Sequence, residues 1–570
     1  MRYLPPTLIA STIDYVRDIQ KPFYTPYCNY TVGMISELIE RVSGLVNSKE
    51  RLYYLPPYDR EAHGDLIDVN IPDGYEEIER YWVYEPYASV SILRDTINKT
   101  LLYYVVEPVL TPFERTMLER LYNDLSDVLT LDDIEIETDA DKREVLRRKA
   151  LELFDHYPIT LQPGALYKIL YFLERNFIGY GKLDVMMRDS RIEDISCDGY
   201  NIPIFLYHVN YRNIETNVSF DENHLNSFVT GLVQRCGKHI STGSPMANAT
   251  MPDGSRLQAT LGQEVTTRGS SFTIRRFRED PFTPVDLINF KTCSIEILAY
   301  LWLAVENNKN ILIVGGTASG KTSTLNAISM FIPPIAKVVS IEDTRELTLH
   351  HENWIASVSR EAIVPQKGIG EVSMFELLKA ALRQRPEYIV VGEVRGEEAL
   401  ILFQAMSTGH ATYSTMHASD IETMVNRLHG EPINVPHAIM QSLDIVALQI
   451  QTYVGHERVR RTKAIIEITG LDSRTGTIKS EVVFRWDPVT DLVRYSGGSL
   501  LLSMIAEGRG WTDEELLDVL AERREVLEYL VKENINDYRE ISRIIQRYSI
   551  DPDEVLSEIR GRTIMSDRTA

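Results

Sequence analysis

The chain has 570 residues, 44% of them hydrophobic and 25% charged, which is the composition of a folded globular protein and excludes a disordered one. At about 150 residues per domain, this length allows about three or four domains. Its 60 basic and 82 acidic residues give a net charge of −22, which repels nucleic-acid backbones and anionic lipid, so we expect no nucleic-acid partner.

The cysteines and the apolar runs limit the cellular setting. Four cysteines are scattered without a CxxC pair, which argues against a disulfide scaffold or a zinc ribbon and favours a reducing compartment. The longest apolar runs, at 297–305 and 311–314, are shorter than the roughly 20 residues of a membrane helix. The N-terminus also lacks the sustained apolar core of a signal peptide. We therefore expect a protein of a reducing compartment without a segment that spans the bilayer.

Residues 1–141 are predicted to form an N-terminal extension. A helix is expected at 34–46, a β-hairpin turning at 95–100, and a second helix at 111–129. This extension is a candidate region for contacts with cargo or a partner.

Residues 142–280 alternate helical and strand patterns, which predicts an α+β domain. Helices are expected at 165–177 and 223–236. Two prolines within REDPFTPVDLI then favour a stiff interdomain linker over residues 281–288.

Residues 289–500 alternate apolar strands with helices, which predicts an α/β domain whose parallel sheet is covered on both faces. Ligands of such sheets bind at the carboxyl ends of the strands. Residues 501–570 are predicted to be helical, and Thr512 with Glu515 forms the pattern of a capping box.

The strongest motif is GGTASGKT, which follows the strand pattern ILIV and precedes a helical pattern. Its glycines let backbone N–H groups approach phosphates closely, while the lysine reaches the β- and γ-phosphates and the threonine hydroxyl can bind Mg²⁺. A glycine-rich turn that binds no ligand would not explain why a lysine and a threonine stand at the positions that the phosphate-binding motif requires. The predicted nucleotide-binding residues are Gly315, Gly316, Thr317, Ala318, Ser319, Gly320, Lys321 and Thr322.

Two further apolar strands end in carboxylates, Glu342 after VVSI and Glu393 after YIVVG. Phosphoryl transfer to water needs one carboxylate near the metal ion and another that orients the attacking water. Either acid alone could be a solvated loop residue, but with the nucleotide loop present we interpret both as catalytic candidates.

His410 and His417 are separated by a β-pattern in GHATYSTMHA. A histidine near a γ-phosphate can report its presence by a hydrogen bond, although a histidine on a strand is often structural. No third ligand of matching type is nearby, so the pair does not predict a metal site.

Basic residues also precede the linker. The structural interpretation is an exposed basic strand. The functional interpretation is that these arginines reach a phosphate held by the next domain or the next subunit. These residues are Arg256, Arg275, Arg276 and Arg278.

Together, GGTASGKTSTLN, SIEDTREL, RQRPEYIVVGEVRGEEA and TGHATYSTMHA resemble the ATPase superfamily of type II and type IV secretion, type IV pili and the archaellum. The segments IEDISCDG and SFTIRRF, with the terminal helices, are similar to archaeal-type members. Bacterial relatives often carry a four-cysteine element that this sequence lacks, and residues 1–141 match no general family motif.

The resemblance implies a RecA-like P-loop domain preceded by a PAS-like α+β domain, and hydrolysis of ATP with Mg²⁺. It implies that Glu342 polarises water, that Thr322 and Glu393 lie in the Mg²⁺ shell, and that His417, with His410, senses phosphate. It also implies that Arg256 and one or more of Arg275, Arg276 and Arg278 approach the phosphates when the domains close.

The resemblance also implies partners. Members form homo-hexamers at the cytoplasmic face of the membrane, beside a polytopic platform protein, and act indirectly on pilin-like or secreted subunits. The sequence does not separate secretion, pilus assembly and archaellum rotation. Two alternatives remain: a DNA-translocating ATPase of conjugation or packaging, and a nucleotide-gated scaffold that does not hydrolyse ATP.

Overall fold

The computed structural model describes residues 55–128, 138–157, 159, 161–278, 280–360, 370–455, 457–472 and 477–569. These residues form two compact units. The first unit contains the described residues up to 192 together with 201–220, and the second contains 193–200 together with 221 onwards. The helix predicted at 34–46 lies outside the described residues.

The first unit contains a sheet in the order β1-β2-β3-β6-β5. Asp95 closes the β2–β3 hairpin, because its carboxylate accepts from the backbone N–H groups of Ile97 and Asn98 at 2.7 and 2.8 Å. The predicted hairpin is thereby confirmed, with an additional strand before it. The strands are β1 (Tyr75–Tyr84), β2 (Ala88–Asp95), β3 (Leu101–Val106), β5 (Pro203–His208) and β6 (Arg212–Ser219).

Three helices of the first unit, α4, α6 and α7, pack around an apolar core. The helices predicted at 111–129 and 165–177 are confirmed as α4 and α7. The helices are α3 (Arg60–His63), α4 (Pro112–Val128), α6 (Asp139–His156), α7 (Pro163–Phe177), the 3₁₀ turn η1 (Gly181–Leu183) and α8 (Asp184–Arg188).

The second unit begins with an antiparallel sheet in the order β4-β9-β8-β7 and with one helix. These elements are β4 (Ile192–Cys197), α9 (Glu222–Arg235), β7 (Met246–Thr250), β8 (Arg256–Thr260) and β9 (Ser271–Arg275). Part of the predicted linker is a helix, α10 (Pro284–Asn289), because Thr283 and Asp286 form a capping box at its start.

A second sheet of nine strands forms the centre of the second unit, in the order β12-β11-β13-β14-β10-β15-β16-β17-β18. The first six strands are parallel, as predicted, and are largely buried because helices cover both faces. They are β10 (Ile311–Gly315), β11 (Val338–Glu342), β12 (Trp354–Val358), β13 (Tyr388–Val391), β14 (Ala411–Met416) and β15 (Ile445–Val454).

The sheet continues with three antiparallel strands that the sequence analysis did not predict. Polar and charged residues interrupt their apolar pattern, since these strands lie towards the sheet edge. They are β16 (Glu457–Leu471), β17 (Ile478–Asp487) and β18 (Leu492–Tyr495).

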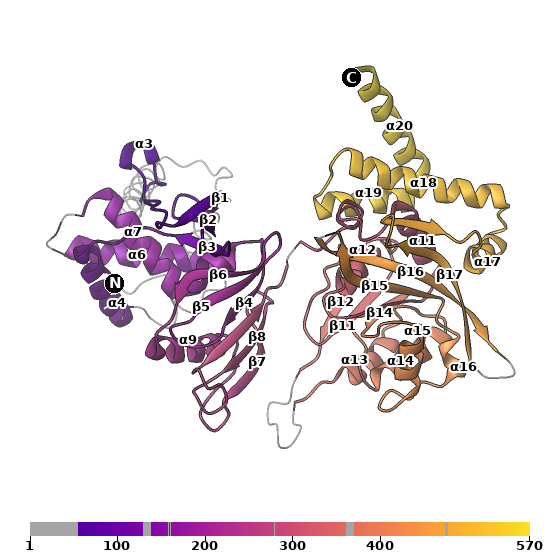
Figure 1. Ribbon diagram of the computed structural model, residues 1–570, viewed down its shortest axis with the longest axis horizontal. Helices are drawn as coiled ribbons and strands as arrows, with labels where there is room; N and C mark the ends of the chain where they lie inside the picture. Colours follow the sequence, from indigo (N-terminus) through magenta and orange to yellow (C-terminus); the bar gives the residue numbers. More distant parts are fainter. Residues whose placement is uncertain are drawn as a thin grey trace, which may run out of the picture. The chain divides into compact units, whose positions relative to one another are not determined.

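Helices form layers on both faces of this sheet (Figure 1). Helices α11 and α12 belong to one hydrophobic core, and α13, α14 and α15 to the other. The helices are α11 (Ile295–Glu306), α12 (Lys321–Ser329), α13 (Met374–Leu382), α14 (Glu398–Ser407), α15 (Ile421–His429) and α16 (His437–Met440).

The C-terminal helices complete the first of these cores, since α18 and α19 bury apolar residues against α11. Arg523 of α18 also pairs with Glu306 at the end of α11. The predicted capping box of Thr512 and Glu515 is confirmed. These helices are α17 (Leu500–Arg509), α18 (Asp513–Lys532), α19 (Tyr538–Ile550) and α20 (Pro552–Thr569).

The predicted fold class, a RecA-like α/β domain with a parallel sheet preceded by an α+β region, is confirmed. Among the described helices, none combines the length and the apolar character needed to cross a membrane.

Candidate nucleotide-binding site

The loop between β10 and α12 has the geometry of a phosphate-binding loop. A Cβ on Gly315 would lie 2.5 Å from the backbone oxygen of Gln449 on β15, so a side chain does not fit there. Gly320 has a φ of +92°, which favours glycine, and it starts the helix at Lys321. The α12 N-terminus, where the first N–H groups of a helix have no partner within that helix, therefore follows directly on the glycine-rich loop, as an anion site requires.

The loop bonds to itself. Lys321 Nζ and Ser319 Oγ both donate to the Gly316 oxygen at 2.9 Å. A Cβ on Gly316 would meet nothing within 4 Å, so there is open space beside that residue. Burial lowers the pKa of Lys321, and the nearby charge of Arg395 adds to that effect while Glu393 opposes it.

Glu342, at the end of β11, is 2% exposed. Its Oε1 accepts from the backbone N–H groups of Glu346 and Leu347 at 2.8 and 3.0 Å. Its Oε2 is buried without a hydrogen-bond partner. Burial raises the pKa of Glu342 to about 7, although the two backbone hydrogen bonds lower it.

Glu393 follows β13, beside β11 in the sheet, and is paired with Arg395, whose Nη2 lies 2.5 Å from its Oε2. Burial alone would raise the pKa of Glu393. The hydrogen bond and charge of Arg395, with the charges of Lys321 and His417, outweigh burial and lower that pKa. The charges of Glu393 and Lys321 therefore affect each other's pKa.

The two histidines lie at opposite ends of β14. His417 follows the carboxyl end, on the same edge as the phosphate-binding loop, and its backbone oxygen accepts from Arg427 of α15. His410 precedes the strand and contacts Thr408. Six strand residues separate the histidines by about 20 Å. The structure thus brings His417, but not His410, to the site.

The four predicted arginines also differ in what they contact. Arg256, at the start of β8, pairs at 3.4 Å with Glu346, which lies in the loop whose N–H groups hold the Glu342 carboxylate. Arg275 lies close enough to lower the pKa of Lys321 slightly, after burial and Arg395. Arg276 donates its backbone N–H to Glu193. Arg278 instead stacks on Phe282, 4.0 Å from the ring centroid.

The structure adds residues that the sequence analysis missed. Arg460 of β16 donates from Nε to the Ala318 oxygen at 3.0 Å, and Ala318 has a φ of +56°. Asn326 of α12 bonds to the loop after Glu342. Arg460 lies among several basic residues in RVRRTK, but sequence alone does not indicate which of them reaches a loop 142 residues earlier.

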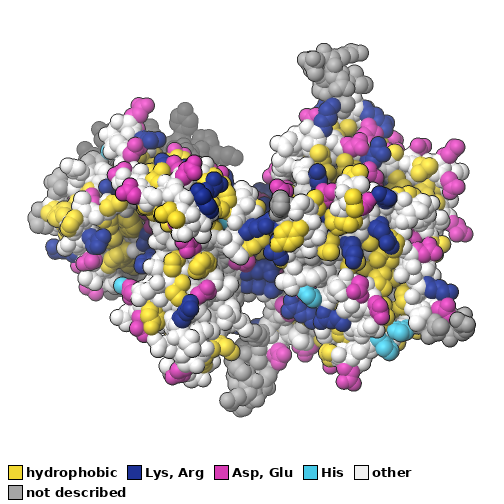
Figure 2. Space-filling view, in the orientation of Figure 1, with side chains coloured by type: hydrophobic (Ala, Val, Ile, Leu, Met, Phe, Trp, Pro, Cys, Tyr) yellow, Lys and Arg dark blue, Asp and Glu magenta, His cyan; other side chains and the backbone are white. Residues whose placement is uncertain are grey.

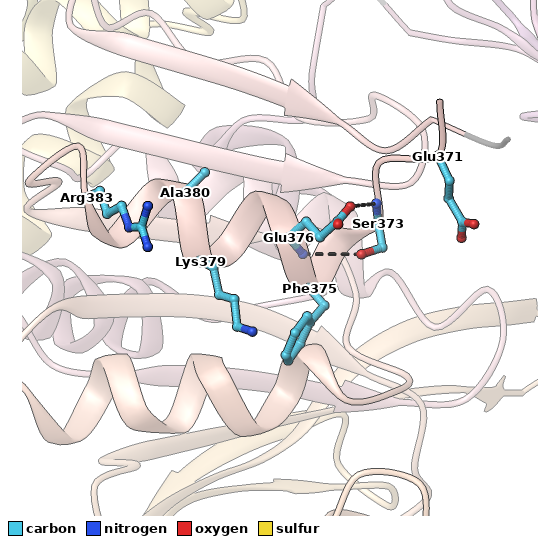
Figure 3. A pocket seen from close by; sticks show the side chains of 7 residues that line it. All are labelled: Glu371, Ser373, Phe375, Glu376, Lys379, Ala380 and Arg383. Atoms are coloured by element: carbon cyan, nitrogen blue, oxygen red, sulfur yellow. Dashed lines mark hydrogen bonds between the residues drawn. The ribbon is translucent and has the colours of Figure 1, made fainter. Parts of the chain in front are cut away.

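One open cavity of about 620 Å³ lies along α13, away from these residues (Figure 3). It has a mixed lining, with the capping pair Ser373 and Glu376 at one end and Lys379 and Arg383 along the helix. Figure 2 shows Lys and Arg side chains gathered on part of the second unit, so the net negative charge does not make every surface acidic.

Comparisons with known proteins place the chain in a family. Residues 207–462 match the family model "Type II/IV secretion system protein", and residues 34–109 match "PilB3-like, N-terminal". The second match gives a family to a segment that the sequence motifs left unassigned.

Among curated proteins, the uncharacterized protein MJ0900 of Methanocaldococcus jannaschii is 35% identical over 497 residues, covering 85% of this chain and 87% of that one. The type IV secretion system protein PtlH of Bordetella pertussis is 29% identical, covering 44% and 82%. Among solved structures, the ATPase DotB of Legionella pneumophila is 20% identical with a TM-score of 0.37, covering 60% and 94%. The chain belongs to the type II/IV secretion-system ATPase superfamily.

Proposed function

We propose that this protein hydrolyses ATP and is the ring motor of a secretion system or of a type IV pilus-like or archaellum filament. The observation that carries this proposal is a loop with phosphate-binding geometry at the same carboxyl edge of the parallel sheet as Glu342, a buried carboxylate with one unpartnered oxygen, in a member of the secretion-system ATPase superfamily.

The residues present fit ATP and Mg²⁺. The space beside Gly316 is open, and the α12 N-terminus follows the loop. Lys321 exchanges its bond to the Gly316 oxygen for a phosphate oxygen when the nucleotide binds. The Thr322 hydroxyl and the Glu393 carboxylate are hard oxygen donors of the kind Mg²⁺ prefers, and would hold it. When bound, Mg²⁺ neutralises charge that develops on the phosphates.

Glu342 orients the attacking water. Its Oε1 is fixed by two backbone N–H groups, which leaves Oε2 to accept a hydrogen bond from water and then its proton. Burial keeps bulk water from competing, and the pKa of about 7 suits a base that works near neutral pH. Because Gly392 lies against the Glu342 side chain, a larger residue there would displace this carboxylate.

The remaining candidates supply positive charge. We assign His417 as the phosphate sensor. We assign Arg256 and Arg275 as the arginines that reach phosphate when the α+β domain closes on the RecA-like domain. Arg256 is held by Glu346 in this structure and would exchange that carboxylate for a phosphate. The motor is proposed to be a homo-hexamer at the cytoplasmic face of the membrane, where closure does work on a polytopic platform protein.

The test has two arms. Purified protein should hydrolyse ATP with Mg²⁺, and Lys321→Ala should lose that activity while keeping its melting temperature. Native mass spectrometry should show hexamers when ATP and Mg²⁺ are present. Equal turnover by wild type and Lys321→Ala would refute the catalytic assignment, and a persistent monomer would refute the ring.

A further inference from the structure

Asn326 joins the phosphate-binding helix to the loop that follows Glu342. It lies on α12, five residues after Lys321, and is 5% exposed. Its Nδ2 donates to the backbone oxygen of Glu346 at 2.9 Å, and its Oδ1 accepts from the backbone N–H of Thr348 at 3.1 Å. Because one bond uses the donor and the other the acceptor, an amide satisfies both positions.

Glu346, whose backbone oxygen accepts from Asn326, is also hydrogen-bonded to Glu342. The Glu346 N–H, with that of Leu347, donates to Glu342 Oε1. The Glu346 backbone is therefore held between Asn326, through its oxygen, and Glu342, through its N–H. Any displacement of this loop relative to α12 would move the two donors that fix the carboxylate and would reorient Oε2.

No regular secondary structure holds this loop among the described residues, since 343–353 contains neither helix nor strand. The side chain of Glu346 adds one external contact, its ion pair with Arg256. This ion pair is partly exposed and 3.4 Å long, so it contributes little, whereas two hydrogen bonds from one amide, whose own side chain is buried, fix both position and orientation.

We propose that Asn326 is a positioning residue for ATP hydrolysis: its amide holds the Glu342 loop in register with the helix that carries Lys321 and Thr322. This inference rests on the proposed function. It predicts that loss of the amide lowers the rate of the chemical step without weakening nucleotide binding.

The experiment measures kcat for ATP hydrolysis and the Kd for a fluorescent ATP analogue with Mg²⁺. Asn326→Ala should lower kcat about tenfold to hundredfold, as small displacements of catalytic groups do, and leave Kd within about threefold. Asn326→Asp keeps the size and the acceptor but loses the donor to Glu346, so kcat should also fall.

The matched control is Ser329→Ala. Ser329 lies on the same helix, is fully buried, and donates to the Leu325 oxygen of its own helix at 2.7 Å. Its loss removes a buried hydrogen bond without touching the Glu342 loop, so kcat should stay within about twofold of wild type.

A double-mutant cycle separates positioning from general damage. In a Glu342→Gln background, Asn326→Ala should cost little more kcat, because the carboxylate it positions is already gone. An undiminished further loss would overturn the inference, as would wild-type kcat in both Asn326 variants or failure of both to fold. If wild type itself does not hydrolyse ATP, the proposed function fails instead.

Discussion

Two buried carboxylates in different units of this protein are held in different ways. Asp189, in the first unit, is 4% exposed, and its Oδ2 accepts from the hydroxyls of Tyr81 and Tyr103 at 2.7 and 2.8 Å. Its Oδ1 accepts from the backbone N–H of Arg191 at 2.9 Å. Glu342, in the second unit, is equally buried, but its Oε2 has no partner.

The difference separates a structural carboxylate from a catalytic candidate. A buried oxygen without a hydrogen bond costs free energy, so folded proteins seldom leave one unless the site has another use. Asp189 has partners for both oxygens and joins β1, β3 and the turn before β4. Glu342 keeps one oxygen available at the carboxyl edge of the sheet, the same edge that carries the candidate phosphate-binding loop after β10. Four experiments test whether the two carboxylates differ in this way.

The largest effect is expected for Glu342→Gln. The amide keeps the size of the side chain but does not accept a proton, so kcat should fall about 100-fold or more. ATP binding, measured by calorimetry with Mg²⁺, should remain. Rapid hydrolysis by this variant would move the role of the base to Glu393.

Asp189→Asn makes the same change, from a carboxylate to an amide, at the structural carboxylate. Its amide would turn a donor towards tyrosine hydroxyls that now donate to the carboxylate, and the free energy of unfolding should fall by about 1–3 kcal/mol in urea titrations. Turnover per folded molecule should not change. A large loss of kcat with unchanged stability would contradict the structural role.

The pH dependence gives a third test. Burial raises the pKa of Glu342 to about 7, so the carboxyl gains its proton as the pH falls through that value. Since a base works only when deprotonated, kcat at saturating ATP should fall about tenfold per pH unit below about 7 and level off above it. A profile that is flat between pH 5 and 8 would exclude Glu342 as the titrating base.

The smallest effect is expected for Arg460→Gln. Loss of the bond to the Ala318 oxygen should loosen the phosphate-binding loop and weaken ATP binding about threefold to tenfold. Arg460→Lys keeps the charge and should recover part of the affinity. Unchanged Kd in Arg460→Gln would show that the loop holds its conformation without this contact.

The local sequence predicted much of the site, because its determinants are close together in the chain. Glycines, lysine and threonine in GGTASGKT specify a phosphate-binding loop, and apolar runs ending in Glu342 and Glu393 specify the carboxyl ends of buried strands. The parallel order of those strands then brings both acids and His417, but not His410, to one edge of the sheet.

The other contacts of the site depend on the tertiary structure. The bonds of Asn326 to residues 346 and 348, and of Arg460 to Ala318, join segments whose sequences carry no sign of each other. The antiparallel extension β16–β18, which supplies Arg460, depends on pairing with β15 rather than on its own pattern. Hydrophobic periodicity is a local signal that specifies strands and helices. Which oxygen of a buried carboxylate lacks a partner depends on every segment packed around it, and only the folded chain fixes that.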